Sequence, residues 1–419
     1  MTVDTRARTE WRDAWPLPFV SAVGYGLAIS QIHSFGVFIE PLQKEFGWSR
    51  GATSSALTVL SAILVFSPVM GSLIDRWGPR RIGVPGAAAY CCAFALLSQV
   101  GPTLWSWWLL WALLGLATLT IQPMTWLSAV ASRFDRSRGL AVAIAFCGAG
   151  IGAALIPPAA QELVQLYGWR LAYVALAAGF AVASLPLLIL FFRDANDVAG
   201  RKPLRETAEP APAAALQGMT LLEAARSARF WKLAIVAFLS VSAITALLVH
   251  FVPLMTWKGL ARADAARIAS LIGLSSIAGR LITGALLDRI NGAVVGAVGF
   301  SLPILLALLI LSTGPQLMPA IAAAILFGLT LGCEVDALGY LTTRHFGMRS
   351  LGAVFGAIIA IESLAVGVGA TVAGFVFDFT GSYRPVLLGL IPIFALSALL
   401  IATLGRYPDF ADTANEHEH

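Results

Sequence analysis

The stretch Gly71-Ser-Leu-Ile-Asp75-Arg76-Trp-Gly78-Pro-Arg80-Arg81 closes the second long apolar segment of the chain, and Gly284-Ala-Leu-Leu-Asp288-Arg289 closes the eighth. The two stretches read almost alike and stand about half a chain apart. A repeat at that distance in an apolar chain predicts two six-helix halves around a central path, an architecture that moves small solutes across membranes. Transport is therefore the first hypothesis for this sequence.

The composition places the chain in a lipid bilayer. Of its 419 residues, 58% are hydrophobic and only 12% are charged, whereas soluble domains average about 25% charged residues. Apolar runs of about 20 residues are long enough to cross the hydrocarbon core as helices. We therefore expect an all-α polytopic membrane protein with twelve transmembrane helices. The predicted spans are approximately 16–39, 51–74, 82–101, 105–131, 139–161, 170–192, 231–256, 265–287, 293–312, 317–341, 350–376 and 384–405.

The positions of Lys and Arg predict the orientation of these spans. With the N-terminus inside, the inner loops hold about three times as many Lys and Arg residues as the outer loops, as the positive-inside rule requires. The net charge of +5 thus reflects topology and not an affinity for nucleic acid, because the basic residues are scattered over many helix ends. We expect both termini to be cytoplasmic.

The domain organisation follows from one long polar connection. Residues 193–230 are rich in Ala, Pro and charge, which is typical of a flexible linker. We expect an N-terminal six-helix half at 1–192, a cytoplasmic linker at 193–230, a C-terminal six-helix half at 231–407 and a disordered tail at 408–419. The four cysteines all fall within predicted spans, so neither a disulfide framework nor a metal site is implied.

The repeated motif suits a gate at the inner face. Its glycines allow helices and a tight loop to approach closely, and its Asp and Arg side chains can bridge neighbouring helix ends. Inner loops carry such charges for topology alone, but two copies at matching positions favour a gate that holds one face of the bundle shut. The predicted gating residues are Gly71, Asp75, Arg76, Gly78, Arg80, Gly284, Asp288 and Arg289.

Arg280 is the clearest candidate for a ligand-binding residue. It lies near the middle of the eighth predicted span, with Ser276 one turn earlier on the same face. A charge at that depth is costly unless it faces a cavity or a partner, and a guanidinium matches a carboxylate with two parallel donors. We predict that Arg280 binds an anion; the alternative is a buried structural ion pair.

Two histidines, His33 in the first span and His250 in the seventh, lie at membrane depth. A two-fold repeat brings the first and seventh helices to one cavity, and neutral imidazole can donate to a carboxylate or carry a proton. We predict that both line the cavity, although either can be a satisfied core donor instead. The predicted substrate-binding residues are Arg280, His33, His250, Ser276 and Gln122.

Carboxyl groups within the spans are candidates for proton coupling. Glu362 lies midway along the eleventh span, and Glu334 and Asp336 lie in the tenth. Burial disfavours the charged form of a carboxyl group, so each can take up and release a proton as access changes. Glu334 and Asp336 are two residues apart on a helix and cannot face one direction. We expect at least one to pair with Arg344 or Arg349, favour a structural role for Asp336, and predict Glu362, Glu334 and His33 as the proton-coupling residues.

The repeated motif, the twelve spans and the central linker resemble the major facilitator superfamily over nearly the whole chain. More narrowly, Glu45-Phe-Gly-Trp-Ser-Arg50, Arg344-His-Phe-Gly-Met-Arg-Ser350 and Arg280 resemble the monocarboxylate transporters and their bacterial relatives, with the oxalate/formate antiporters next nearest. The resemblance implies that Arg280 binds the substrate carboxylate. It also implies that His33 takes the place of a first-span lysine that binds proton and substrate in animal members.

Three residues depart from these families. Animal monocarboxylate carriers have an aspartate one turn before the eighth-span arginine, where this chain has Ser276. Glu362 stands roughly where oxalate carriers have a second cationic residue, which argues against a small dianion as substrate. Trp111 stands four residues before Gly115, where many proton-coupled members of the superfamily have an arginine. The proton site therefore cannot be carried over from the family.

These inferences combine into a prediction of proton-linked symport of a monocarboxylate or similar organic anion by alternating access, in a bacterial inner membrane. The alternative within transport is an antiporter or exporter of an organic anion or amphipathic compound; a third reading is a non-transporting membrane sensor. We expect no enzyme, because no Ser/His/Asp, metal or phosphate-loop arrangement is found. The expected partners are a small organic anion, protons and membrane lipid, with no cofactor and no nucleic acid, for a monomeric protein.

Overall fold

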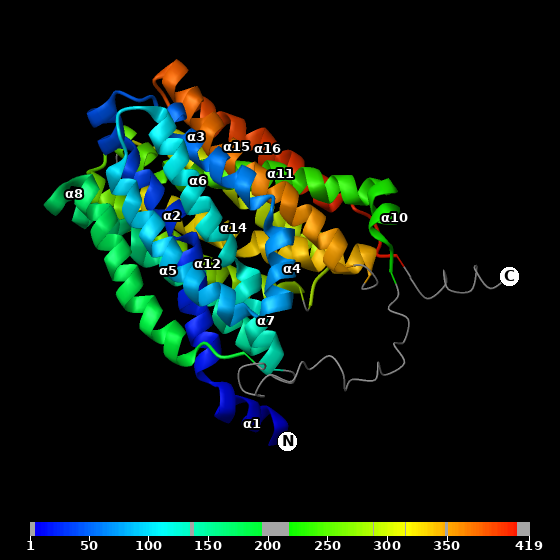
Figure 1. The fold of residues 1–419 in the computed structure, drawn as a ribbon. Coiled ribbons are helices and arrows are strands. Elements are labelled where there is room, and N and C mark those ends of the chain that lie inside the picture. Colours follow the sequence, from blue (N-terminus) through cyan, green and yellow to red (C-terminus); the bar gives the residue numbers. More distant parts are fainter. Residues whose placement is uncertain are drawn as a thin grey trace.

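The computed structural model describes residues 5–134, 138–194, 218–287, 289–314, 316–347 and 351–408. Within these ranges every regular element is a helix, apart from one isolated bridge between Gly218 and Gly347. The helices pack side by side into a single bundle (Figure 1). The predicted all-α polytopic class is confirmed.

The helices before the linker are α1 (Thr5–Ala14), α2 (Pro16–Phe46), α3 (Arg50–Leu64), α4 (Ser67–Trp77), α5 (Pro79–Leu96), the short 3-10 helix η1 (Leu97–Gln99), α6 (Leu104–Thr120), α7 (Pro123–Arg133) and α8 (Arg138–Phe191). We call them the N-terminal group. Two predicted spans are each broken into two helices, because Pro68 and Pro123 lack the N–H that would continue the preceding helix.

The helices after the linker form the C-terminal group. They are α10 (Leu221–Arg226), α11 (Ala228–Trp257), α12 (Arg262–Leu287), α13 (Gly292–Ser312), α14 (Leu317–Phe346), α15 (Leu351–Thr380) and α16 (Arg384–Ala402). The short helix α10 begins with a capping box formed by Thr220 and Glu223. Residues 195–217 and 409–419, which hold most of the predicted linker and tail, lie outside the described residues.

The described helices supply twelve membrane crossings. Ten segments are long and apolar enough to span a bilayer. One of them, Leu140–Phe191, has 52 residues and would be about 78 Å long if straight, which far exceeds about 30 Å of hydrocarbon. It turns at Gly168, where φ is 76° and ψ is 164°, so it crosses twice. The broken pair α3 and α4 provides the remaining crossing.

The buried apolar side chains form two clusters. One is built from residues 14–192 together with Val249 and Ala370, and the other from residues 224–404. Val249 and Ala370 belong to the C-terminal group, so they mark where the two groups of helices meet. Where the two groups meet, α15 packs on α3, α12 on α8 and α11 on α2. Helices α3 and α15 run side by side in Figure 1. The interior of the bundle is therefore lined by helices from both groups.

Candidate functional site

Arg280 lies on α12, at the meeting of the two groups of helices. Its Cζ is 5.2 Å from the ring centre of Phe146 on α8, and its Nε is 3.7 Å from Oδ2 of Asp336 on α14. The distance to Asp336 is that of an ion pair and is too long for a hydrogen bond. The side chains of Arg280 and Asp336 are each 26% exposed. The guanidinium therefore keeps accessible donors for a further acceptor.

Aromatic residues of the N-terminal group complete the surroundings of Arg280. The ring of Tyr25 on α2 meets the ring of Phe146 edge to face, with centres 5.3 Å apart and planes at 78°. Tyr25 also lies within electrostatic range of Arg280, Asp336 and Glu362. We call Tyr25, Phe146, Arg280, Asp336 and Glu362 the central cluster. It joins one guanidinium to two carboxyl groups and draws on both groups of helices.

The two carboxyl groups of α14 face different directions, as predicted. Glu334 is 4% exposed and accepts a hydrogen bond of 2.7 Å from the hydroxyl of Ser240 on α11, whereas Asp336 faces Arg280. The predicted pairing at the inner end is not found among the described residues, because Arg280 on the adjacent helix is the cation that Asp336 meets. Arg344 lies over the ring of Tyr407 instead, 4.6 Å from its centre. Arg349 lies outside the described residues.

Glu362 is half-buried on α15 and has no hydrogen bond or ion pair with a described residue. The cation of the central cluster is paired with Asp336, so an Arg280–Glu362 ion pair does not occur in this conformation. Glu362 does lie within electrostatic range of Glu334. The cluster therefore contains one carboxyl group more than its single guanidinium can balance.

The side chains of three other predicted ligands form no hydrogen bond with the guanidinium of Arg280. The hydroxyl of Ser276 donates to the carbonyl of Gly273, one turn earlier on α12, at 2.7 Å. His33 and Gln122 are half-buried, and neither side chain forms a hydrogen bond or an ion pair with a described residue. His33 stands eight residues after Tyr25 on α2, a rise of about 12 Å along the helix. The structure thus places His33 in a different layer of the bundle from the central cluster.

His250 occupies a closed hydrogen-bond network and not a ligand cavity. Its Nε2 is 3.0 Å from the carbonyl oxygen of Ala370 and 3.4 Å from the hydroxyl of Ser54. Because a carbonyl only accepts, Nε2 carries the proton, and Nδ1 accepts from the hydroxyl of Tyr383 at 2.9 Å. The side chain is 1% exposed, so no ring nitrogen remains for a substrate. In this conformation His250 fits the alternative that the sequence left open, a core histidine whose hydrogen bonds are satisfied, and its ligand role stays a prediction.

The network continues from Tyr383 to the N-terminal group. Arg50 donates to the oxygen of Tyr383 at 2.7 Å, and its guanidinium lies over the ring of Phe377. The carboxylate of Asp378 accepts from the backbone N–H of Arg50 at 2.8 Å and of Gly51 at 2.6 Å. The Asp378 carboxylate therefore lies at the N-terminus of α3, where the helix dipole favours a negative charge. These contacts tie α3 to α11, α15 and the turn before α16.

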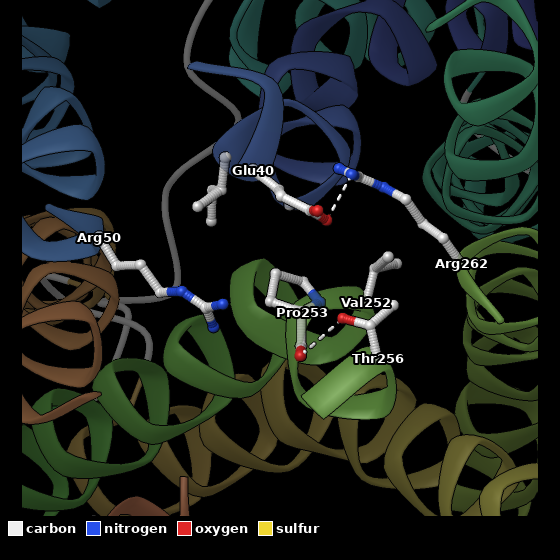
Figure 2. A pocket seen from close by; sticks show the side chains of 8 residues that line it. Glu40, Arg50, Val252, Pro253, Thr256 and Arg262 are labelled. Atoms are coloured by element: carbon white, nitrogen blue, oxygen red, sulfur yellow. Dashed lines mark hydrogen bonds and ion pairs between the residues drawn. The ribbon is translucent and has the colours of Figure 1, made fainter. Parts of the chain in front are cut away.

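A second ion pair closes the same end of the bundle. Arg262, at the start of α12, donates to Glu40 on α2 at 2.5 Å and to the carbonyl of Val37. Figure 2 shows Glu40 reaching toward Arg262, with Arg50 on the other side of a small pocket. We call the contacts of Glu40, Arg50, His250, Arg262, Asp378 and Tyr383 the seam. All of them lie toward the end of the bundle that holds Gly47, and they join the two groups of helices.

The repeated motif lies at the opposite end of the bundle. Gly78 separates α4 from α5 with φ of 88°, a backbone region that favours glycine. Arg80 donates to the carbonyl of Ile189 at 2.8 Å, which is a contact within the N-terminal group. A Cβ atom on Gly71 or Gly284 would meet no atom within 4 Å, so the predicted close approach of helices at these glycines is absent from this conformation.

The remaining motif residues are only partly described. Arg76 and Arg289 are exposed. The side chain of Asp75 and the whole of Asp288 lie outside the described residues. Helix α4, which carries the first copy of the motif, packs on α5, α6 and α7 of the N-terminal group.

Comparisons with known proteins agree with this architecture. Residues 19–370 match the family model of the Major Facilitator Superfamily. The chain is 26% identical over 383 residues to "Monocarboxylate transporter 11" from Homo sapiens, covering 85% of this chain and 76% of that protein. It is 25% identical over 371 residues to "Monocarboxylate transporter 13" from Bos taurus, covering 87% and 82%. The crystal structure of the nucleoside transporter NupG superposes with a TM-score of 0.73 over 94% of this chain and 99% of that chain, at 12% identity, which is a likeness of fold.

Proposed function

The chain belongs to the Major Facilitator Superfamily, and on that premise we propose that this multi-pass membrane transporter carries an organic anion with one carboxylate by proton-linked symport. The observation that carries the proposal is the position of Arg280. It is a guanidinium at membrane depth between both groups of helices, it is partly accessible, and its only described ion-pair partner is held at 3.7 Å.

Arg280 is suited to a carboxylate. An intramembrane cation is costly unless it serves a ligand or a partner, and the planar fork of guanidinium matches the two oxygens of a carboxylate. Two relatives whose names describe monocarboxylate transporters support this class of substrate. A dianion fits less well, because Asp336 and Glu362 already bring two carboxyl groups to the cluster.

Asp336 is our candidate for the proton site. While ionised it competes with the substrate carboxylate for Arg280; once protonated it releases the guanidinium. Binding of the anion and of a proton would therefore favour each other. Asp336 supplies the carboxyl group that the chain lacks at Ser276. Glu362, the other carboxyl group of the central cluster, is the second candidate, whereas Glu334 accepts a hydrogen bond from Ser240.

We further propose how the bundle is oriented and how it moves. With both termini cytoplasmic in a bacterial inner membrane, the seam faces outside and the repeated motif faces the cytoplasm. The structure then corresponds to a state closed outside, in which Gly71 and Gly284 have open space beside them. In the opposite state the seam would open, and Gly71 and Gly284 would let the inner helix ends approach. The two rocking units would be the predicted halves, 1–192 and 231–407.

The proposal is tested with purified protein in liposomes. Uptake of a labelled monocarboxylate should accelerate under an inward acid gradient and should disappear in Arg280→Gln. Acceleration by preloaded carboxylate, with no response to the gradient, would favour exchange over symport. Uptake that survives Arg280→Gln in a variant that retains the wild-type thermal transition would contradict the proposed carboxylate site.

A further inference from the structure

We propose that Phe146 and Tyr25 make this site selective for monocarboxylates with a planar, unsaturated body, such as aryl carboxylates, over saturated carboxylates of equal size. The inference rests on the proposed function, because it takes Arg280 as the residue that binds the carboxylate. It concerns the organic group to which the carboxylate of the substrate is attached.

Three planar side-chain groups, those of Tyr25, Phe146 and Arg280, lie close together. The guanidinium of Arg280 lies 5.2 Å above the ring of Phe146, and the ring of Tyr25 stands at 78° to that ring. All three side chains are half-buried, so each keeps some accessible surface. Two of the groups come from the N-terminal helices and one from the C-terminal helices.

A bound carboxylate would direct its substituent toward the aromatic pair. A carboxylate meets guanidinium edge on, in the plane of the fork. Because the guanidinium lies over the ring of Phe146, with Cζ 5.2 Å from the ring centre, and Tyr25 meets Phe146 edge to face, we expect the group behind the carboxylate to reach these two rings. A planar substituent can lie flat against one ring and edge to face with the second, which are the two arrangements that aromatic pairs prefer.

A saturated substituent of the same size gains the apolar burial but not this aromatic interaction. Aromatic pairs contribute a preference of about 2- to 12-fold in affinity beyond burial. Acidic side chains near Tyr25 limit the negative charge that the substituent can carry. Asp336 and Glu362 both lie within electrostatic range of the Tyr25 hydroxyl, so a second negative charge on the ligand would be repelled there.

A different reading is that Phe146 only positions Arg280 through the cation–π contact. That role would change the affinity for every carboxylate by the same factor, because all of them use the same guanidinium. Selection of the substituent would change the ratio between planar and saturated ligands. The ratio therefore separates the two roles, whatever the absolute affinity of a variant.

The experiment measures the binding of benzoate and of cyclohexanecarboxylate to the purified full-length protein by calorimetry at one pH. We expect benzoate to bind about 2- to 12-fold more tightly. Phe146→Leu should bring the ratio close to one. Tyr25→Phe should keep the ratio, because the ring remains, whereas Tyr25→Leu should lower it and serves as the second route if Phe146→Leu does not fold. Phe379→Leu is the matched control, because Phe379 is 87% exposed, and it should not alter the ratio.

Equal affinities in the wild-type protein, or a ratio unchanged by both Phe146→Leu and Tyr25→Leu, would overturn this inference while leaving the carboxylate site in place. A uniform weakening of both ligands in these variants would assign the aromatic pair to positioning alone and would also overturn it. Benzoate binding that survives Arg280→Gln, or no binding of either ligand, would overturn the proposed function and this inference with it.

Discussion

Removing the hydroxyl of Tyr383 should open the seam. In Tyr383→Phe, Arg50 loses an acceptor at 2.7 Å and Nδ1 of His250 loses its donor at 2.9 Å. A hydrogen bond from a charged donor contributes about 1.5–3 kcal/mol and a neutral one about 0.5–1.5 kcal/mol. The closed seam should therefore lose about 2–4.5 kcal/mol. If the open state makes neither contact, the equilibrium shifts toward opening by about 30- to 2,000-fold.

The opening can be measured as a distance between spin labels across the seam. Thr103 in the N-terminal group and Arg267 in the C-terminal group are both exposed, and each can carry a label in a cysteine-free background. We expect Tyr383→Phe to add a population at longer distance. Tyr407→Phe is the control, because the hydrogen bonds of the Tyr407 hydroxyl with described residues join it to Asn291 and Gly292, within the C-terminal half of the chain. A wild-type distance distribution in a folded Tyr383→Phe protein would refute the reasoning.

Three further results are expected. Arg262→Gln should weaken the closed seam by about 1 kcal/mol, since the pair with Glu40 is only half-buried, and should lengthen the same label distance; an unchanged distance would contradict the role of this pair. Gly71→Val should leave benzoate affinity within a few-fold but slow turnover in liposomes, because the added methyl groups find open space here and would meet the inner helix ends only in the other state. Burial raises the pKa of the Tyr383 phenol to about 12, so the contribution of its hydrogen bonds should be fully present below its ordinary value of 10.0 and lost as pH rises through about 12, with the label distance as readout.

The bundle itself was predictable because crossing a bilayer imposes a length on each apolar run. The break within the predicted span 51–74 does not follow from its apolar composition. It lies at Pro68, which lacks the backbone N–H donor that a continuous helix needs. The predicted spans 139–161 and 170–192 lie on either side of Gly168, where the long helix turns. In both places the backbone conformation depends on one residue, whereas the presence of a span depends on the composition of about 20 residues.

The site was predictable only where a residue type is rare at its depth. Arg280 stands out because an arginine within an apolar span needs an explanation. Tyr25 and Phe146 do not stand out, because aromatic residues are common in such spans for packing alone. His250 has the rare residue type, but its contacts with Tyr383 and Ala370 could not be predicted, because these partners are 133 and 120 residues away in sequence. The pairing of Asp336 with Arg280 likewise depends on the packing of α12 against α14.

The most direct test of the central claim is the affinity for benzoate, measured between about pH 6 and pH 8, in the wild-type protein and in Asp336→Asn. Benzoate stays ionised in this range, so any pH dependence comes from the protein. If protonated Asp336 frees Arg280 for the carboxylate, wild-type affinity should rise as pH falls, by up to tenfold per pH unit where Asp336 titrates. Asp336→Asn, which mimics the protonated acid, should bind tightly without pH dependence, while Glu362→Gln should keep the wild-type slope. A wild-type slope in Asp336→Asn would contradict the account.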